Sequence, residues 1–417
     1  MMAAQPGPVL QPVAPVRPSR GRPRWGHQTS LFQLRQPAFW LFLALVLATG
    51  YYTVTQQTLF QRISPSGWAL SWLLLLVYAL PIFAAVYLLD LYEREPLSLV
   101  VGALVWGAVA ATTLAGYANE GWGFVVARIG GPEFASRWTA ALTAPFTEEI
   151  LKAAGVVLIA LIAADEIDDM MDGFVYGAMV GLGFAVVEDV LYFIAIFGGT
   201  PSGVLAGFYV RVISSGLYGH VLYTGLSGMG IAYFVSRRHE QTRGKRVGVA
   251  VLLFLVAAFG HFLWDSPLLN FFPGRLDTVG DWLQIPLAAA IKGIPLLVFV
   301  IVLVKLARRR ERGWLELALA SEVGSTALTP QELGILVDPR ARRRSRREMR
   351  TRAGEGAARL LRRLQREQIN VAMVRARIEA EDDVALVHQR EYCRSLRDAL
   401  MAMPGAAPAI RPTEPPG

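Results

Sequence analysis

An all-α membrane protein, built as a polytopic bundle of about eight transmembrane helices, is the fold class that this sequence predicts. Three observations predict it. Hydrophobic residues make up 53% of the 417 residues and the mean hydropathy is +0.39, more apolar than an ordinary soluble domain. Eight apolar runs are long enough, at about 17 to 25 residues, for helices that cross a bilayer. Lys and Arg gather in a few places between them, as expected for loops on one side of a membrane.

Each apolar run is expected to form one helix. In chain order the runs cover residues 38–55, 67–89, 98–117, 140–164, 173–197, 208–236, 247–264 and 283–306. An even number of spans puts both ends of the chain on the same side. Basic clusters at residues 17–35, 237–246 and 305–310 all fall on that side, which the positive-inside rule makes the cytoplasmic one. The net charge of +8 therefore reflects membrane orientation, and no nucleic-acid partner is expected.

Changes in composition divide the chain into three regions. Residues 1–36 are rich in Pro, Arg and Gln and are predicted to be a disordered cytoplasmic N-terminus. The apolar run behind them lacks a convincing signal-peptide cleavage site, so we predict a retained helix. Residues 37–306 form the predicted transmembrane domain, and residues 307–417 form an Arg-rich, mainly helical cytoplasmic tail.

The tail contains one clear helix start. Thr329, Pro330 and Glu332 have the spacing of a helix cap, with proline at the first helical position. Scattered apolar residues among the arginines then predict surface helices that pair with each other or lie against anionic lipid. Cys393 is the single cysteine of the chain, which excludes an intrachain disulfide and a cysteine metal site.

An acidic turn interrupts the basic character of the predicted cytoplasmic loops. It joins the fourth and fifth spans and holds Asp165, Glu166, Asp168, Asp169 and Asp172. Acidic residues weigh little in membrane topology, so the number of spans stands. A solvated turn is the simple interpretation, and contact with a cation or a partner is the alternative.

Ionisable side chains recur in four consecutive predicted spans. They are Glu148 and Glu149 in the fourth, Glu188 in the fifth, His220 in the sixth, and His261 with Asp265 in the seventh. Such groups at membrane depth cost ~2.5 to 3.5 kcal/mol each on insertion scales, so they usually mark functional sites. Glu149 and Glu188 lie roughly 15 residues, or ~22 Å, from the cytoplasmic ends of the hairpin they share. The histidines fall at similar depth, which predicts one buried polar layer with Lys292 as a counter-charge.

Several of these residues also have a structural explanation. Glu148 and Lys152, four residues apart, can form an ion pair on one helix face. A lone intramembrane histidine is often only a hydrogen-bonding group between helices. Asp265, one turn after His261, can orient the imidazole, contact a substrate or cap the helix. Of the neighbouring polar groups, Asp189 and Arg211 are interpreted as packing or boundary residues.

Two glycine-rich segments are interpreted as packing surfaces. Gly177, Gly181 and Gly183 lie in the fifth span, and Gly225, Gly228 and Gly230 lie in the sixth. Small residues at such spacing let membrane helices approach closely.

Two histidines and several carboxylates in one layer suit more than one chemistry. A buried Glu can act as general base on a water while His supplies a proton or polarises a carbonyl. Alternatively, a divalent metal on His and Glu ligands activates the water, although no HExxH helix of the zincin type occurs. An ion- or proton-coupled transporter also carries Glu, Asp and His through the bilayer and is the alternative class.

Four motifs follow one another along the predicted membrane domain: EEILK from Glu148, DEIDDMMDGFVYGAMVGLGFAVVEDVLYF from Asp165, GHVLYTGLSGMG from Gly219 and GHFLWD from Gly260. Together they resemble the PrsW family of bacterial intramembrane proteases, of the CAAX-protease and bacteriocin-processing superfamily. The resemblance implies a multi-span endopeptidase of the bacterial inner membrane that hydrolyses a peptide bond in a single-span membrane protein, such as an anti-sigma factor. Where the family commonly has Glu-Asn, this chain has Glu188 followed by Asp189, which puts hydrogen bonding by that Asn in doubt.

The resemblance also assigns expected roles to the polar layer. Glu148 or Glu149 activates water, Glu188 and His220 assist or bind a metal, and His261 with Asp265 stabilises the oxyanion. If a metal is bound, zinc or another divalent ion on Glu188, His220 and His261 is expected. The family has been described as metallo-type and as glutamic-type, and both mechanisms stay open, with a cofactor or with none.

Overall fold

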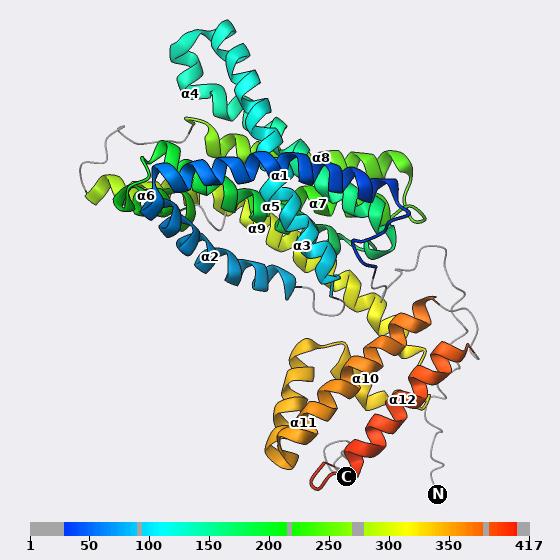
Figure 1. Ribbon diagram of the computed structural model, residues 1–417. Helices are drawn as coiled ribbons and strands as arrows, with labels where there is room; N and C mark the ends of the chain where they lie inside the picture. Colours follow the sequence, from blue (N-terminus) through cyan, green and yellow to red (C-terminus); the bar gives the residue numbers. More distant parts are fainter. Residues whose placement is uncertain (1–28, 90–93, 215–218, 269–278, 378–382, 407–417) are drawn as a thin grey trace, which may run out of the picture.

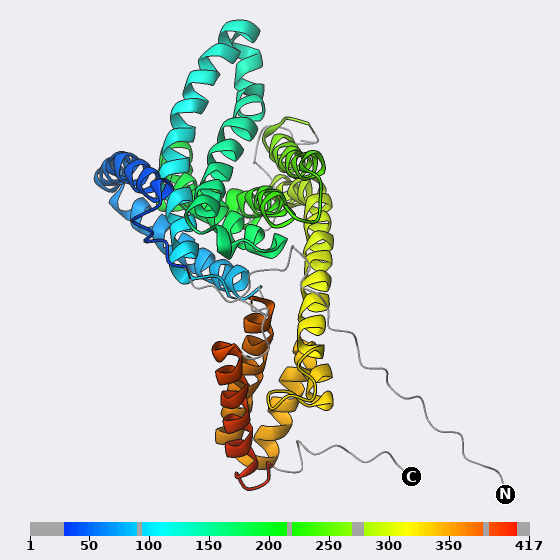
Figure 2. The same cartoon turned by 90° about the vertical axis from the view of Figure 1, so that its right-hand side faces the viewer.

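The computed structural model describes residues 29–89, 94–214, 219–268, 279–377 and 383–406. Every named element in this part of the chain is a helix, which confirms the all-α prediction (Figure 1). A membrane part and a smaller C-terminal bundle make up the molecule, joined by one long helix (Figure 2).

The membrane part consists of eight α-helices with short irregular helical turns between them. They are α1 (Pro37–Ile63), α2 (Pro65–Tyr87), α3 (Leu97–Val105), η1 (Trp106–Ala111), α4 (Thr112–Ile162), η2 (Ala164–Glu166), α5 (Met170–Leu191), η3 (Tyr192–Ile196), α6 (Pro201–Phe208), η4 (Tyr209–Ile213), α7 (His220–Ser236) and α8 (Arg243–Asp265). The connecting helix is α9 (Val279–Ala320), whose first part belongs to the same membrane layer.

Six of the described helical stretches are long and apolar enough to cross a bilayer. One of them, Leu97–Ile162, is a continuous run of 66 residues that folds back on itself. The turn is at Gly131, whose φ of 78° lies in the left-handed region that glycine adopts without strain. The third and fourth predicted spans are the two arms of this hairpin, and the 17-residue α7 lies within the sixth predicted span.

The hairpin differs from the prediction in its length. Two spans of about 20 to 25 residues were expected at 98–117 and 140–164, with a loop between them. Instead both arms stay helical to Gly131 and project well past the neighbouring helices (Figures 1 and 2). Pro132 directly follows Gly131, so the second arm starts with a proline in its first turn, where the missing N–H costs little.

The sixth predicted span, 208–236, is wrong at its start. Pro201 begins the short helix α6, which ends in the π-helical turn η4 at Ile213. The spanning helix α7 then begins at His220. The residues around the break, YVRVISSGLYGH from Tyr209, include two serines and two glycines, turn residues that a prediction from hydropathy does not use.

α5 is the central helix, and the glycines bring α7 against it. A Cβ added at Gly177 would lie 2.2 Å from the carbonyl oxygen of Thr224, and one at Gly181 would lie 2.2 Å from that of His220. Only glycine allows this approach, so the packing role predicted for these residues is confirmed. The close contact also fixes the start of α7, and with it His220, against the middle of α5.

Several connections lie together at one end of the bundle. The backbone N–H of Thr29, just before α1, donates to Glu166 in the turn between α4 and α5 (2.6 Å). Arg310 near the end of the membrane part of α9 pairs with Glu240 in the turn between α7 and α8 (2.6 Å). Residues 1–28 of the predicted disordered N-terminus lie outside the described residues, whereas Thr29 and the residues up to α1 pack here.

Side chains of the acidic turn cap the N-terminus of α5. The side chain of Asp169 accepts from the backbone N–H of Met171, and Asp172 accepts from the N–H of Asp169 at 2.8 Å, which makes a capping box. These carboxylates thus cap α5, and Glu166 is bonded to Thr29.

The C-terminal region forms a helical bundle with its own core. Its helices are α10 (Pro330–Leu336), α11 (Pro339–Arg377), which bends at Gly354, and α12 (Val384–Met401). Thr329 and Glu332 form the predicted capping box of α10. Apolar side chains such as Leu364 and Leu400 are buried between these helices, so they pair with each other (Figure 2).

Candidate active site

The polar residues of four helices converge where α4, α5, α7 and α8 meet. Glu148, Glu149 and Lys152 come from α4, Glu188 from α5, His220 from the start of α7, and His261 and Asp265 from the end of α8. The predicted polar layer is therefore one connected cluster in the structure, and the side chains of Glu149 and Lys152 are completely buried. Isolated charges at that depth would be costly, so each is expected to have partners.

Lys152 is the central cation of the cluster. Its Nζ lies 2.7 Å from Glu149 Oε1, 3.3 Å from Glu148 Oε2 and 2.9 Å from His220 Nδ1. It also lies 4.0 Å from the centre of the Phe184 ring. The ion pair expected between Glu148 and Lys152 exists, but the closer partner of the lysine is Glu149.

The two adjacent glutamates occupy different environments. Glu149 uses both oxygens, because Oε1 also lies 3.0 Å from His261 Nδ1 and Oε2 accepts from Thr224 (3.3 Å). Glu148 accepts from Asn119 through Oε1 (3.0 Å), whereas its buried Oε2 takes part in no hydrogen bond among the described residues. Glu148 thus has an unused acceptor, and Glu149 does not.

Asn119 was not predicted, because it lies in the segment interpreted as a loop between two spans. Thr147 donates to its side-chain oxygen, which turns the amide N–H₂ towards Glu148. The sequence offered one signal, a polar amide in an apolar helical run near the predicted third span.

His261 faces two carboxylates with its second ring nitrogen. Since Nδ1 donates to Glu149, Nε2 is left facing Asp265 Oδ2 at 3.3 Å and Glu148 Oε2 at 3.8 Å. Two carboxylate oxygens around one nitrogen need a positive partner, which is either a proton on Nε2 or a bound cation. The ring is held in this orientation by Tyr223, stacked at 5.1 Å between centroids.

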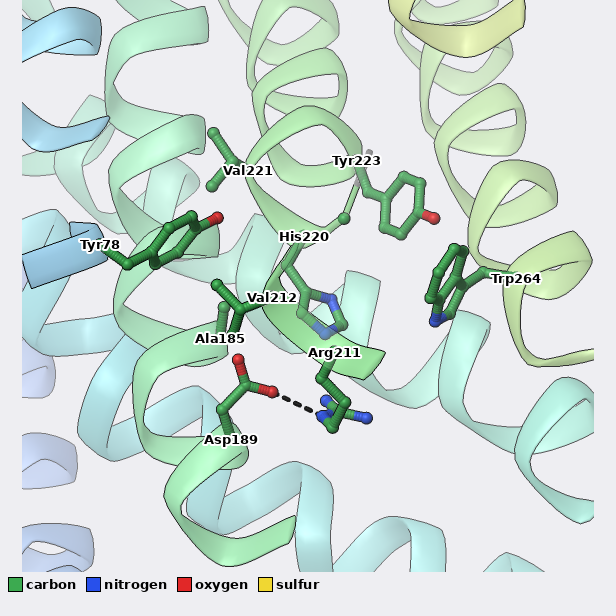
Figure 3. Close-up of a pocket in the computed structure, with 10 residues that line it drawn as sticks. Tyr78, Ala185, Asp189, Arg211, Val212, His220, Val221, Tyr223 and Trp264 are labelled. Atoms are coloured by element: carbon green, nitrogen blue, oxygen red, sulfur yellow. Dashed lines mark hydrogen bonds and ion pairs between the residues drawn. The ribbon is translucent and has the colours of Figure 1, made fainter. Parts of the chain in front are cut away.

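His220 has partners at both ring nitrogens. Lys152 donates to Nδ1, and Nε2 therefore donates to Glu188 Oε2 at 3.0 Å. Arg211 Nη2 also lies 2.6 Å from that oxygen of Glu188, and its Nε lies 2.6 Å from Asp189 Oδ1. Figure 3 shows the Arg211 and Asp189 pair beside the imidazole of His220. The two residues interpreted as packing groups are thus part of the same network.

Lys292, the expected counter-charge, contacts the end of α8. Its Nζ donates to the backbone carbonyls of Trp264 and Ser266 at 3.2 and 3.0 Å. These carbonyls flank Asp265, so the lysine holds the last turn of α8 beside the cluster.

One group of side chains has the spacing of a metal site. Glu148, His220 and His261 each offer one ligand atom, and the three atoms lie within 4.8 Å of one another. The expected set had Glu188 in place of Glu148, but Glu188 is engaged by Arg211 and His220. Glu148 Oε2, which accepts no hydrogen bond, and His261 Nε2, which lies beside two carboxylate oxygens, suit a divalent cation, and Glu149 behind His261 is a typical supporting carboxylate.

A cavity of about 550 Å³ leads to the cluster. Its lining includes Glu148, Glu188, His220, His261 and Asp265, residues of both arms of the α4 hairpin, and Phe184, Leu191, Tyr192, Arg211 and Trp264. Glu149 and Lys152 are not among its lining residues. A ligand in the cavity therefore meets Glu148 and His261 directly and Glu149 only through His261.

The PrsW family of intramembrane metalloproteases matches residues 95–304, which contain the whole cluster. The chain is 31% identical over 201 residues to Protease PrsW of Geobacillus kaustophilus, covering 47% of this chain and 72% of that protein. It is 34% identical over 110 residues to Protease PrsW of Bacillus subtilis, covering 26% of this chain and 46% of that one. No solved structure matches this chain.

Proposed function

Because this chain belongs to the PrsW family of intramembrane proteases, we propose that the cluster around Glu148 and His261 hydrolyses a peptide bond of a membrane-protein substrate. One observation carries the proposal. Glu148, His261 and Asp265 line a cavity of about 550 Å³, and His261 Nε2 lies 3.8 Å from Glu148 Oε2 and 3.3 Å from Asp265 Oδ2. Hydrolysis needs a base beside a water and a positive group beside the carbonyl oxygen, and these residues supply both.

Each residue then has a role set by its contacts. Glu148 takes the proton of the attacking water at Oε2, and Asn119 holds its other oxygen. His261 Nε2 lies beside the carbonyl oxygen that becomes negative, with Asp265 orienting the ring from one side and Glu149 from the other. Between the two glutamates left open by the sequence, these contacts favour Glu148 as the base.

His220 and Glu188 complete the site from the other side. In this arrangement the imidazole of His220 accepts a hydrogen bond from Lys152 and donates one to Glu188, and the ion pair with Arg211 holds the Glu188 carboxylate in place. Their role is to orient the cluster, and the proton that Glu148 takes from the water passes from Glu148 to the leaving amine.

We favour the metal-dependent version of this chemistry. The residues that would hold a divalent ion are Glu148, His220 and His261, and His220 must release Lys152 or Glu188 to offer a nitrogen. Such an ion supplies polarisation of the carbonyl and a more acidic water. In this version Glu148 and His261 would hold the ion, so their roles as base and as partner of the carbonyl oxygen belong to the version without a metal.

The deciding experiment uses the purified protein in liposomes with a model single-span substrate. The wild type should give two fragments, and Glu148→Gln should abolish them. Glu133→Gln in the same helix is the control, because Glu133 is exposed at the hairpin and should retain full activity. Substrate-dependent flux without fragments would instead make the protein a transporter.

Metal dependence is tested on the same preparation. Loss of cleavage in chelator, with recovery on adding zinc or another divalent ion, and a bound metal in the purified protein support the metal-dependent version. Full cleavage by metal-free protein would reject it in favour of a proton on His261.

We propose a bacterial inner-membrane location with both termini in the cytoplasm, and a single-span protein such as an anti-sigma factor as substrate. The basic residues and the contacts at one end of the bundle support this orientation. Enzyme reporters fused after residue 240 and at the C-terminus should both be active in the cytoplasm. A periplasmic signal from either fusion would reverse the topology.

A further inference from the structure

The positive charge of this chain is concentrated on α11 in the C-terminal bundle. Residues 339–366 hold twelve arginines but only two glutamates, an excess larger than the net charge of +8 of the whole chain. Most of these arginines are exposed. A run of like charges is often only a solvated surface, so the arrangement of the arginines in space decides whether they form a site.

The bend of α11 at Gly354 brings its two arms side by side. Gln365 in the second arm donates to the hydroxyl of Ser345 in the first arm at 2.9 Å. Arg346 directly follows Ser345, and Arg362 lies one helical turn before Gln365. This hydrogen bond therefore places the two arginines, which are 16 residues apart in sequence, at the same level of the bundle.

Four arginines gather at this level, and we call them the arginine cluster. Arg342, Arg343 and Arg346 come from the first arm, and Arg362 comes from the second. Burial, followed by the positive charges of the other three, lowers the pKa of the Arg346 guanidinium. The fold thus holds like charges together at a cost in repulsion.

The two glutamates of this segment do not balance the cluster. Glu355 pairs with Arg350 at 2.6 Å. Glu348 is exposed and lies two residues from Arg346, a spacing at which helical side chains do not face each other. Apart from Arg342, the members of the cluster form no ion pair with a carboxylate among the described residues. An anion from outside the chain would supply the missing charge.

We propose that the arginine cluster binds the phosphate groups of anionic lipids, such as phosphatidylglycerol, at the surface of the bilayer. A guanidinium presents paired N–H donors that match two oxygens of one phosphate. Basic residues close to a membrane are also attracted by its negative surface potential. The apolar sides of the C-terminal helices pair with each other, which leaves the arginines of α11 free to contact lipid.

The attachment of the bundle favours lipid over polyanions in solution. Arg308 of α9 donates to the carbonyl of Leu89, just past the end of α2, which marks where these helices leave the membrane part. From there α9 continues without a break to Ala320, a distance of only ~18 Å. The cluster is therefore held permanently near lipid phosphates at high local concentration.

The figures agree with contact between the bundle and lipid. Figure 2, which looks nearly along α1, shows the C-terminal bundle to one side of the spanning helices. Lipid rather than protein therefore forms the membrane surface next to it. In Figure 1 the first arm of α11, beside its label, lies on the side of the bundle nearest α2.

Fluorescence quenching in the full chain tests the proposal. A dye on Thr351→Cys, an exposed position of the first arm, reports contact with lipids that carry a spin label on the headgroup. The protein is placed in nanodiscs of phosphatidylcholine, alone or with an equal part of phosphatidylglycerol. Quenching should be roughly threefold or more stronger with phosphatidylglycerol, and high salt should remove the difference. The native Cys393 is buried and should not take the dye.

Two sets of substitutions separate charge from structure. Arg343→Gln, Arg346→Gln and Arg362→Gln together should abolish the effect of phosphatidylglycerol. Lysine at the same three positions keeps the charge and should retain most of the effect. Arg394→Gln is the control for position, because Arg394 is exposed on α12 and pairs with Glu391, so this variant should behave like the wild type. The salt dependence of the wild type keeps the test decisive if the Gln variant does not fold.

Equal quenching in the two kinds of nanodisc, or a Gln variant that responds to phosphatidylglycerol like the wild type, would overturn the proposal. Equal quenching together with salt-sensitive binding of a single-stranded RNA, lost in the Gln variant, would assign the cluster to nucleic acid instead. Neither readout depends on cleavage, so the proposed protease function is tested separately.

Discussion

Replacing Lys152 by Met should unfold the protein far more easily, because this one ammonium holds three buried partners. Its Nζ donates to Glu149 at 2.7 Å and to His220 at 2.9 Å, and it forms an ion pair with Glu148 Oε2 at 3.3 Å without a hydrogen bond. Removing one member of a buried ion pair costs ~3 to 5 kcal/mol, since the remaining charge stays buried without compensation. Met fills a similar volume, so the loss of charge, rather than a cavity, should dominate.

The assay is the free energy of unfolding of purified variants in detergent. Lys245→Met is the matched control, because Lys245 is exposed at the start of α8 and its loss should change stability by no more than about 0.5 kcal/mol. Adding Glu149→Gln to Lys152→Met removes one of the stranded charges. The double variant should therefore be more stable than the sum of the single costs predicts, with a coupling of ~1 to 3 kcal/mol.

Two results would refute this reasoning. Lys152→Met could unfold like Lys245→Met, in which case the lysine does not balance the carboxylates. Alternatively, the costs of Lys152→Met and Glu149→Gln could add fully, which would mean that the two side chains stabilise the fold independently.

Three further predictions follow from other parts of the structure. Burial raises the pKa of the Asp169 carboxyl from 3.8 to about 6, partly offset by the N–H of Met171, so the folded state holds this proton more tightly than the unfolded chain. Ionisation of Asp169 should therefore lower the stability of the folded state as pH rises from about 4 to 6. Asp169→Asn, which keeps an acceptor for the helix cap, should reduce this dependence of the melting temperature on pH, and an unchanged dependence would contradict the assignment. Burial also raises the pKa of the Cys393 thiol to about 12, so Ellman's reagent at pH 8 should leave it unmodified until denaturant is added, and rapid labelling of the native protein would contradict its burial. Gly177→Ala should destabilise the protein by ~1 to 3 kcal/mol, because the new methyl group would lie 2.2 Å from a carbonyl oxygen of α7. Gly248→Ala is the control, because its methyl group would meet nothing within 4 Å and should not lower the stability. Equal melting temperatures for the two variants would reject the tight packing of α5 against α7.

The sequence was sufficient for the helical fold and for most members of the site, because both depend on local signals. Apolar length gives a span, and a charge within a span is rare enough to mark a site, which is how Glu148, Glu188 and His261 were found. The similar depth of these residues in separate spans was enough to predict one cluster.

Other features depend on contacts between distant segments, which single-sequence patterns do not contain. Asn119 is 29 residues from Glu148, and the two meet only because the hairpin arms stay helical to Gly131. Arg211 joins the network through η4, a turn hidden inside an apolar run. The different surroundings of Glu148 and Glu149 likewise follow from where α7 and α8 pack, so the sequence left the choice of base open.

α9 connects the C-terminal bundle mechanically to the end of α8. It is a single helix of 42 residues, ~63 Å long. Lys292 of this helix donates hydrogen bonds to the backbone carbonyls on either side of Asp265. Pro286 and Pro295 lie on either side of Lys292 and each removes a backbone hydrogen bond, so the helix bends most easily around this attachment. A tilt of the C-terminal bundle is therefore taken up as bending at Pro295, and the last turn of α8 stays in place beside the cluster.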